Sequence, residues 1–407
     1  MLLCEMPSFS RRRLLSQGGA LFAWAYLPSF ARAADRRDPR LVVIVLRGAL
    51  DGLSALAPVG DPDYVALHGE LALRLDGEHP ALPLDPFFAL NPAMPNFARL
   101  YAARQALAVH ACATNYRDRS HFDGQDVLES GMPGPGRIES GWLNRALVAL
   151  PAGERVAGRG LAVGVTPPLV LRGQAPVLGW APSGLPAASE DLTARLLDLY
   201  AHRDPALAAA LRQGLDADRL ASEQGMAAMK PGGDVALAMQ NAAEGAARLL
   251  SADDGPRVAA LSFDGWDTHA NEGGATGRLA QLLGGLDRAI AAFERELGPV
   301  WKDTAIVAIT EFGRTVRING TVGTDHGVGT LAFLAGGAIA GGRIVADWPG
   351  LKTADLYEGR DLKPTTDLRA VLMGLLADQF GLSPAVLART VFPETGGLKP
   401  LAGLVRA

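Results

Sequence analysis

Carboxylate and imidazole side chains recur along this chain in short motifs that contain glycine. The candidate metal ligands in these motifs are Asp51, Asp267, His269, Glu311, Asp325 and His326. Carboxylate oxygens and imidazole nitrogens are the ligands that hard and borderline divalent cations prefer in proteins. The set therefore predicts a site for one or two divalent ions, either Zn²⁺, Mn²⁺, Mg²⁺ or Ca²⁺. Each motif alone could instead be an ordinary loop, because Asp and Gly are common turn residues, and an Asp can also cap a helix.

A separate motif, YRDRSHFDGQD at residues 116–126, combines hydroxyl, imidazole and guanidinium groups. Ser120 and His121 are its candidate catalytic residues, and Ser120 also has the sequence context of a helix N-cap. A hydroxyl at a helix N-terminus lies beside free backbone N–H groups that bind anions, and a nearby metal ion can turn it into a nucleophile. The candidate substrate-binding residues are Arg117, Arg119 and Arg314, which could hold an oxyanion through paired hydrogen bonds or could be surface charges.

Short apolar runs precede most of these motifs. The runs are Leu41–Leu46, Leu107–Cys112, Val258–Ser262, Thr304–Thr310 and Leu331–Leu334. They are apolar on successive residues, which is typical of strands that helices cover on both faces. Between Leu279 and Leu297, apolar residues at spacings of three and four predict an amphipathic helix that ends at Gly298. The alternation predicts an α/β fold, a three-layer sandwich around a mainly parallel central sheet.

The predicted fold brings the candidate ligands together. In open α/β sheets, functional groups gather just beyond the carboxyl ends of the strands. Asp51, Asp267 and Glu311 each follow one of the predicted strands. We therefore expect the candidate ligands to lie at one edge of the sheet.

Residues 1–33 have the features of a twin-arginine signal peptide. Arg11 and Arg12 open a basic run, a modest apolar stretch follows, and residues 31–33 form an A-x-A cleavage pattern. The apolar stretch is far shorter than the roughly 20 residues that span a bilayer, so we expect no stable membrane anchor. We expect the Tat export machinery as a partner, a mature chain that begins at Ala34, and a periplasmic or secreted location.

The composition is that of a globular protein, because 48% of the 407 residues are hydrophobic and 20% are charged. We expect a single α/β domain over residues 34–407, with an alanine- and leucine-rich helical insertion at about 187–250. Residues 1–33 hold four arginines and one glutamate, so the formal charge of −4 becomes about −7 without them, and nucleic acid is not an expected partner. Cys112 is the one cysteine outside residues 1–33, which excludes an intrachain disulfide in the mature chain and predicts a small buried apolar residue.

The order of these motifs resembles that of the Tat-exported bacterial domain-of-unknown-function 1501 family. The motifs are VVIVLRGALDGL, YRDRSHFDGQDVLESG, GWDTHAN, TEFGRT and GTDHG, and they run over nearly all of the mature chain. That family is similar in turn to the alkaline phosphatase and sulfatase superfamily, in which a metal site lies beside a nucleophile at a helix start. By position, the resemblance implies Ser120 as the nucleophile and a metal site built from Asp51, Asp267, His269, Glu311 and His326.

Three departures from the superfamily pattern bear on these expectations. Phe312 follows Glu311 where the superfamily commonly has Asp-His, and the spacing from Asp267 to His269 is shorter than in the superfamily. A single ion, or a differently populated pair, is therefore an alternative to a two-zinc site. Cys112 precedes the predicted helix start by eight positions, so no cysteine stands where sulfatases carry the one that matures to formylglycine.

The resemblance implies an exported metal-dependent hydrolase that cleaves phosphate or sulfate esters, with a small anionic ester as its substrate. The ion would lower the pKa of Ser120 or of a bound water and stabilise charge on the transferred group. The alternatives are a non-catalytic exported binding or assembly protein that retains the hydrolase fold, and another enzyme class such as a mutase or an esterase. A fold alone does not decide among them.

Overall fold

The computed structural model describes residues 37–150, 160–164, 166–182, 190–223 and 234–406. The predicted signal peptide at residues 1–33 and the predicted mature start at Ala34 lie outside these ranges. Residues Pro39–Ala407 form one compact unit, to which all the described helices and strands belong. None of the described helices is long and apolar enough to cross a membrane.

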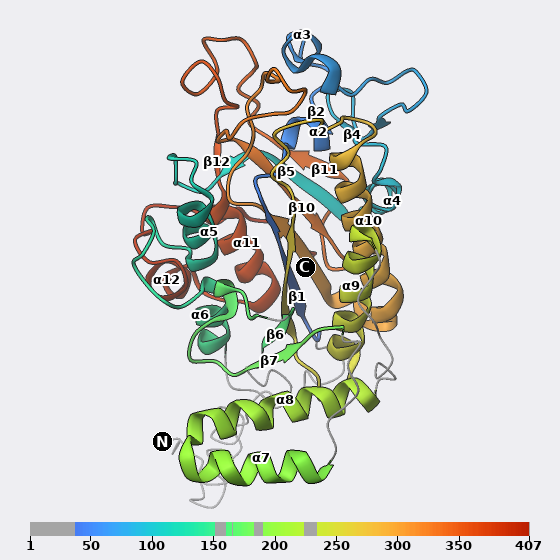
Figure 1. Ribbon diagram of the computed structural model, residues 1–407. Coiled ribbons are helices and arrows are strands. Elements are labelled where there is room, and N and C mark those ends of the chain that lie inside the picture. The colour runs from blue at the N-terminus through green and yellow to red at the C-terminus, as the bar shows by residue number, and fades with distance from the viewer. Residues whose placement is uncertain (1–36, 151–159, 165, 183–189, 224–233, 407) are drawn as a thin grey trace, which may run out of the picture. The chain divides into compact units, whose positions relative to one another are not determined.

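A mainly parallel sheet of nine strands lies at the centre of this unit (Figure 1). The strands are β1 (Arg40–Arg47), β5 (Ala106–Ala113), β6 (Gly160–Val163), β7 (Val177–Trp180), β8 (Val258–Asp264), β9 (Thr304–Ile309), β10 (Thr330–Ala335), β11 (Arg343–Val345) and β12 (Thr366–Asp367). Their order is β11-β5-β10-β9-β1-β8-β6-β7, with β12 paired to β5. Among the described strands of this sheet, β10 is the one that runs antiparallel to its neighbours. All five predicted strands are present, and the predicted α/β fold class is confirmed.

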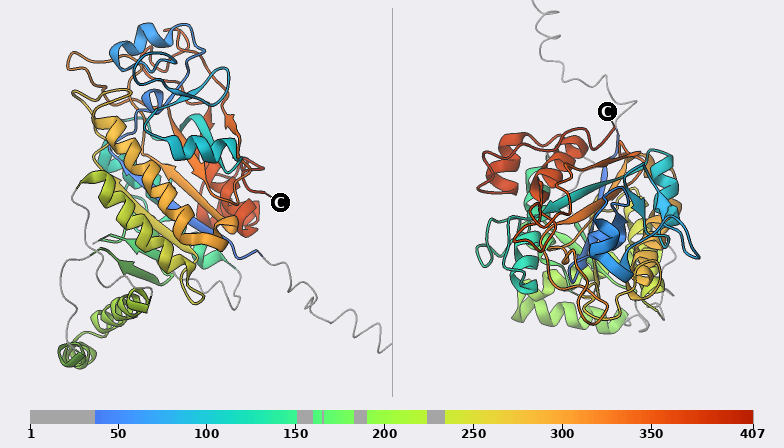
Figure 2. Two further views of the ribbon diagram at one scale, coloured as in Figure 1. Left: turned by 90° about the vertical axis from the view of Figure 1, so that its right-hand side faces the viewer. Right: turned by 90° about the horizontal axis from the view of Figure 1, so that it is seen from above.

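Helices cover both faces of the sheet, which explains why successive strand residues are apolar. In β1, Val42 and Ile44 belong to one buried cluster and Leu41 and Val43 to the other, and none of the four is exposed. The first face packs against α4 (Pro95–Ala102), α9 (Val235–Ser251) and α10 (Arg278–Leu297). The second face packs against α5 (His121–Ser130), α6 (Trp142–Ala149) and α11 (Leu368–Phe380). The result is a three-layer sandwich (Figures 1 and 2).

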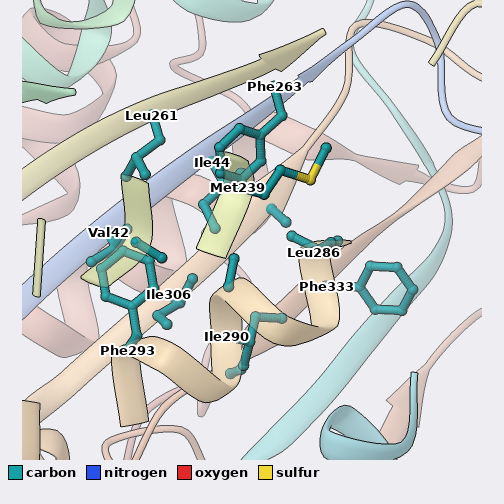
Figure 3. Packing of buried hydrophobic residues seen from close by; sticks show 14 of the residues in the cluster. Val42, Ile44, Met239, Leu261, Phe263, Leu286, Ile290, Phe293, Ile306 and Phe333 are labelled. Atoms are coloured by element: carbon teal, nitrogen blue, oxygen red, sulfur yellow. The ribbon is translucent and has the colours of Figure 1, made fainter. Parts of the chain in front are cut away.

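The helix α10 is the amphipathic helix that the sequence predicts. Its Leu286, Ile290 and Phe293 are buried and face apolar side chains of the sheet such as Ile44 and Ile306 (Figure 3). The helix ends at Leu297, and Gly298 begins the 3₁₀ helix η4 (Gly298–Asp303). The strand β5 carries Cys112, which is free and buried, as expected.

A second, smaller sheet of three strands lies between β1 and β5 in the sequence. It consists of β2 (Leu56–Ala57), β4 (Ala89–Leu90) and β3 (Leu82–Pro83), in that order across the sheet. Short helices in the described ranges include α2 (Gly52–Ala55), α3 (Tyr64–His68), η2 (Gly69–Leu71), η3 (Leu169–Leu171), α12 (Pro384–Val386) and η5 (Leu387–Val391).

The described residues of the predicted helical insertion fall in three helices. They are α7 (Glu190–Arg203), α8 (Pro205–Glu223) and α9. The helices α7 and α8 contact each other, and α8 contacts the edge strand β7. The helix α9 packs along α10 and belongs to one layer of the sandwich.

Candidate metal centre

Strand directions bring four distant segments to one edge of the sheet. β1 is parallel to β8 and β9, and β10 is antiparallel to both β9 and β5, so β5 runs in the same direction as β1. The segments that follow β5, β8 and β9 carry His121, Asp267 and Glu311. His326 comes from the loop that leads into β10, which begins at the same edge because β10 is antiparallel.

Three imidazoles and one carboxylate meet at this edge. The Nε2 atom of His326 lies 3.0 Å from Nε2 of His121 and 3.0 Å from Nε2 of His269. Oδ1 of Asp267 lies 3.0 Å from Nε2 of His269, 3.2 Å from that of His326 and 3.4 Å from that of His121. We call these four residues, whose donor atoms could hold a metal ion, the metal centre.

The ring nitrogens on the outer side of the three imidazoles all face acceptors. Nδ1 of His121 lies 2.9 Å from Oε1 of Glu311, and Nδ1 of His326 lies 3.0 Å from the carbonyl oxygen of Arg119. Nδ1 of His269 lies 3.4 Å from Oδ1 of Asp325. Ionised carboxylates and carbonyls can only accept, so these partners favour a proton on each Nδ1 and direct the Nε2 lone pairs of the neutral rings inward. Histidine ligands of metals are held in this way.

The spacing of the inner atoms fits one ion. The three ligand atoms of His121, Asp267 and His326 form a compact group, with separations of 3.0, 3.2 and 3.4 Å. A tetrahedral ion with bonds of about 2.0–2.1 Å holds its ligand atoms about 3.3 Å apart. His269 lies 3.0 Å from two of these atoms and can provide a further ligand.

The charges around the metal centre move the pKa values of two histidines in opposite directions. The hydrogen bond to Glu311 raises the pKa of His121, more than partial burial lowers it. Burial, followed by the positive charges of His121 and Arg314, lowers the pKa of His326. Without an ion, protonated His121 can therefore donate from Nε2 to the lone pair of His326. A divalent ion would take the place of that proton.

Glu311, a predicted ligand, lies behind His121. Its Oε1 accepts hydrogen bonds from the backbone N–H of Gly48 and from Gln125, besides contacting His121. Burial raises the pKa of Glu311, but these hydrogen bonds outweigh burial and hold the pKa below its usual range. Phe312 stacks on the His121 ring, with centroids 5.0 Å apart. The imidazole beside position 312 is therefore that of His121, from α5.

Arg314, a predicted substrate-binding residue, is buried beneath the metal centre. Its side chain has no exposed surface, and its Nη2 lies 2.6 Å from Oδ1 of Asp267. Its other hydrogen bonds go to the backbone carbonyls of Gly48, Ala49, Trp266 and Thr324 and, at 3.4 Å, to Nε2 of His269. Such a guanidinium fixes the position of Asp267 and does not reach solvent, which does not suit the predicted role.

The other two predicted substrate-binding arginines also have partners. Arg119 donates to Asp361 and Glu358, and Arg117 donates to two backbone carbonyls that precede it. Arg119 has a φ of +59°, a conformation that non-glycine residues adopt at a cost and that often occurs at functional sites. This conformation places its carbonyl opposite His326. Substrate binding by Arg117 or Arg119 stays a prediction and would require these partners to be exchanged.

Asp51, also predicted as a ligand, lies outside the metal centre. Its Oδ1 accepts from the backbone N–H of Leu53 and caps α2, and its Oδ2 lies 3.2 Å from Nε2 of His68. Burial raises the pKa of Asp51, but the charge of His68 and the hydrogen bonds from His68, Ser54 and Leu53 together outweigh burial and lower the pKa. Asp51 is therefore a helix cap in the structure, which was the alternative to its interpretation as a metal ligand.

Glu272 is a buried residue near these groups that the sequence analysis missed. Its Oε2 accepts a hydrogen bond of 2.7 Å from Thr324. Burial, followed by the negative charge of Asp51, raises the pKa of Glu272 to about 8. The sequence could have indicated Glu272 as a further candidate, because it lies only three residues after the candidate ligand His269.

Ser120 precedes α5 as predicted, but its side chain makes no capping hydrogen bond. Its backbone N–H lies 3.3 Å from the hydroxyl of Tyr116. Burial raises the pKa of Tyr116, and hydrogen bonds with Ser120 oppose this rise. Ser120 therefore contacts the Tyr116 phenol through its backbone N–H, and its hydroxyl does not cap α5.

Gly48 joins the end of β1 to the metal centre, and alanine should not be tolerated there. Its φ is +121°, and a Cβ atom would lie 2.5 Å from the backbone N of Asp267. We expect Gly48→Ala to lower the free energy of unfolding by about 2–5 kcal/mol, through backbone strain and overpacking. Chemical denaturation measures this loss.

Gly77 provides the matched control for Gly48. Its φ is also positive, at +94°, but no atom lies within 4 Å of the position of its Cβ. Gly77→Ala should therefore cost only the backbone strain, about 1–2 kcal/mol. Equal losses in the two variants would show that contact with the Asp267 segment does not restrict position 48.

The fold and the metal centre together define an α/β sandwich protein with histidines and carboxylates at the carboxyl edge of its parallel strands. The family model "Protein of unknown function (DUF1501)" matches residues 103–391. The chain belongs to this family, which the sequence motifs had indicated. No curated protein matches the sequence.

Solved structures give remote likenesses. Ps i-CgsB in complex with k-i-k-neocarrahexaose is 12% identical, with a TM-score of 0.43, and the match covers 89% of this chain and 74% of that one. Ps i-CgsB alone is 12% identical, with a TM-score of 0.40 and coverages of 90% and 78%. The phosphonate monoester hydrolase of Agrobacterium radiobacter is 13% identical, with a TM-score of 0.32 and coverages of 85% and 74%.

Proposed function

We propose that this protein is a metal-dependent hydrolase of phosphate or sulfate esters. The observation that carries the proposal is the shared orientation of three imidazoles, each with Nδ1 against an outer acceptor and Nε2 directed at one carboxylate oxygen. This orientation is characteristic of metal ligands. His121, Asp267 and His326 would hold the ion, with His269 as the fourth ligand.

In this proposal the ion, the residues around it and Ser120 have different roles in hydrolysis. When bound, a divalent ion supplies Lewis acidity that stabilises charge on the transferred group. Arg314 would hold Asp267 in place, and Glu311 would orient His121. Oγ of Ser120 would give up its proton and form a bond to the phosphorus or sulfur atom, while the bond from that atom to the ester oxygen breaks and this oxygen takes up a proton and leaves as the alcohol. Water would then cleave the Ser120 ester and release inorganic phosphate or sulfate.

A second function, ligand binding without catalysis, has one observation in its favour. The Arg314 guanidinium lies 2.6 Å from the Asp267 oxygen that faces the imidazoles. This ion pair lets the four residues persist as a hydrogen-bonded cluster without any metal. A folded protein that binds metal but turns over neither ester class would support this alternative.

We also propose that the protein works outside the cytoplasm. The proposal is supported by the paired arginines and the A-x-A pattern in residues 1–33. Export in a folded state would suit a metal centre whose residues come from three distant segments.

The affinity for metal should depend on pH, because the ion competes with a proton on His121. Its raised pKa means that a proton competes for the metal centre up to a higher pH than for an ordinary histidine. We expect Zn²⁺ affinity to fall as the pH falls through that pKa, and binding below it to release about one proton. Isothermal titration calorimetry in buffers of different ionisation enthalpy measures both quantities.

Turnover of 4-nitrophenyl phosphate and 4-nitrophenyl sulfate by the Zn²⁺- or Mn²⁺-loaded protein completes the test of the proposed function. Hydrolysis of either ester that a chelator abolishes and the metal restores is the expected result. Failure to bind any of Zn²⁺, Mn²⁺, Mg²⁺ or Ca²⁺ would overturn the proposal.

A further inference from the structure

Phe122 is the most exposed large apolar residue in the described part of the chain. Its exposed fraction is 90%, whereas the next value among these residues is 54%, for Leu75. Because 90% of its surface is exposed, its side chain contributes little packing to the fold. A single exposed apolar residue is ordinary on a protein surface. The significance of Phe122 depends on its location.

Phe122 is placed beside the metal centre by the geometry of α5. It follows His121 directly, at the N-terminal end of this helix. It also shares a helix face with Glu129, because seven residues make about two turns. Glu129 contacts Arg47, the last residue of β1, at 2.6 Å, so this face of α5 is on the side of the β1 exit.

The β1 exit leads directly to the metal centre. Gly48 follows Arg47, and a Cβ on Gly48 would lie 2.5 Å from the backbone of Asp267. Phe122 stands about two turns, or roughly 10 Å, beyond Glu129 toward the N-terminal end of the helix. At the His121 end of α5, Phe122 therefore continues the helix face on which Glu129 contacts Arg47.

The metal centre is partly open to solvent. The side chains of Asp267 and His269 are each 44% exposed, whereas Glu311 and Arg314 beneath them have no exposed side-chain surface. A substrate must approach from the exposed side. Its reacting group would reach the metal centre while the rest of the molecule extends past the α5 end that carries Phe122.

We propose that Phe122 determines specificity, and that its ring packs against a ring in the alcohol part of the ester. The inference rests on the proposed function and names the substrate class as monoesters of ring-bearing alcohols. An aromatic face binds either another aromatic ring or the apolar face of a sugar, through the same burial of flat apolar surface. Phe122 would touch only the leaving group, so small alkyl esters would not depend on it.

Binding of non-hydrolysable phosphonates to the Zn²⁺-loaded full chain tests the proposal without requiring turnover. Phenylphosphonate should bind more tightly than methylphosphonate, and Phe122→Ala should weaken only phenylphosphonate, by about tenfold. Phe122→Trp should retain the preference. Val148→Ala, which removes another exposed apolar side chain, should change neither affinity. A phosphonate analogue of glucose 6-phosphate tests whether the ring is a sugar or an aryl group. Tighter binding of this analogue than of phenylphosphonate indicates a sugar, and the reverse order indicates an aryl group.

The outcomes separate this inference from the proposed function. Equal affinities for the two phosphonates, unchanged in Phe122→Ala, would overturn the role of Phe122 and leave the metal site standing. A similar loss of both ligands in Phe122→Ala would also overturn it, because the ring would then not be selective. Absence of binding by either phosphonate to the metal-loaded wild type would overturn the inference together with the hydrolase proposal.

Discussion

Replacing His326 with alanine should remove metal binding and turnover together. Nε2 of His326 contacts all three other members of the metal centre, at 3.0–3.2 Å. Loss of an outer partner of a metal ligand costs about 10- to 100-fold in affinity or activity, and loss of the ligand itself should cost more. We therefore expect Zn²⁺ affinity to fall more than about 100-fold, measured by calorimetry, with turnover below detection at Zn²⁺ concentrations that saturate the wild type.

Two matched variants show whether the loss is specific. Glu311→Gln keeps the side-chain shape but removes the charge that raises the pKa of His121, so it should lose only about 10- to 100-fold. His202→Ala removes an exposed histidine of α7 and should leave affinity and turnover unchanged. If His326→Ala binds Zn²⁺ as tightly as the wild type, the four residues are a hydrogen-bonded cluster and not a metal site.

Replacing Ser120 with alanine should abolish turnover while the metal remains bound. None of the four residues of the metal centre is changed, but the attacking oxygen is removed. We expect kcat to fall at least about 1,000-fold, since loss of a nucleophile in a comparable enzyme costs more than that. The Ser120 side chain makes no capping hydrogen bond, so the free energy of unfolding should change by less than about 0.5 kcal/mol.

The Ser120→Asp variant distinguishes a role of Ser120 as nucleophile from a role as helix N-cap. Aspartate is a favourable N-cap residue but offers no hydroxyl for attack, so this variant should be at least as stable as the wild type and remain inactive. Substantial turnover in either variant, with metal bound, would contradict a covalent step through Ser120. Direct attack by water would then be the mechanism to test.

Local patterns in the sequence determined the layers of the fold. Continuous apolar runs such as Val42–Leu46 can be stable only between two layers of helices, and the three-and-four spacing along α10 can bury only one side of a helix. Strand ends were likewise visible as changes from apolar to polar residues, which located Asp267 and Glu311 at the carboxyl edge of the sheet. These features depend on neighbours in sequence, so periodicity reveals them.

The tertiary structure alone decided which polar groups meet and what each one does. Glu311 and His121 are 190 residues apart, and their contact makes the carboxylate an outer partner of the imidazole. Asp51 follows a strand as Asp267 does, yet it faces the buried His68, supplied by α3. A side chain's role in a metal site depends on distances of a few ångströms between segments that only strand order and register bring together, and no local pattern of residue types encodes those distances.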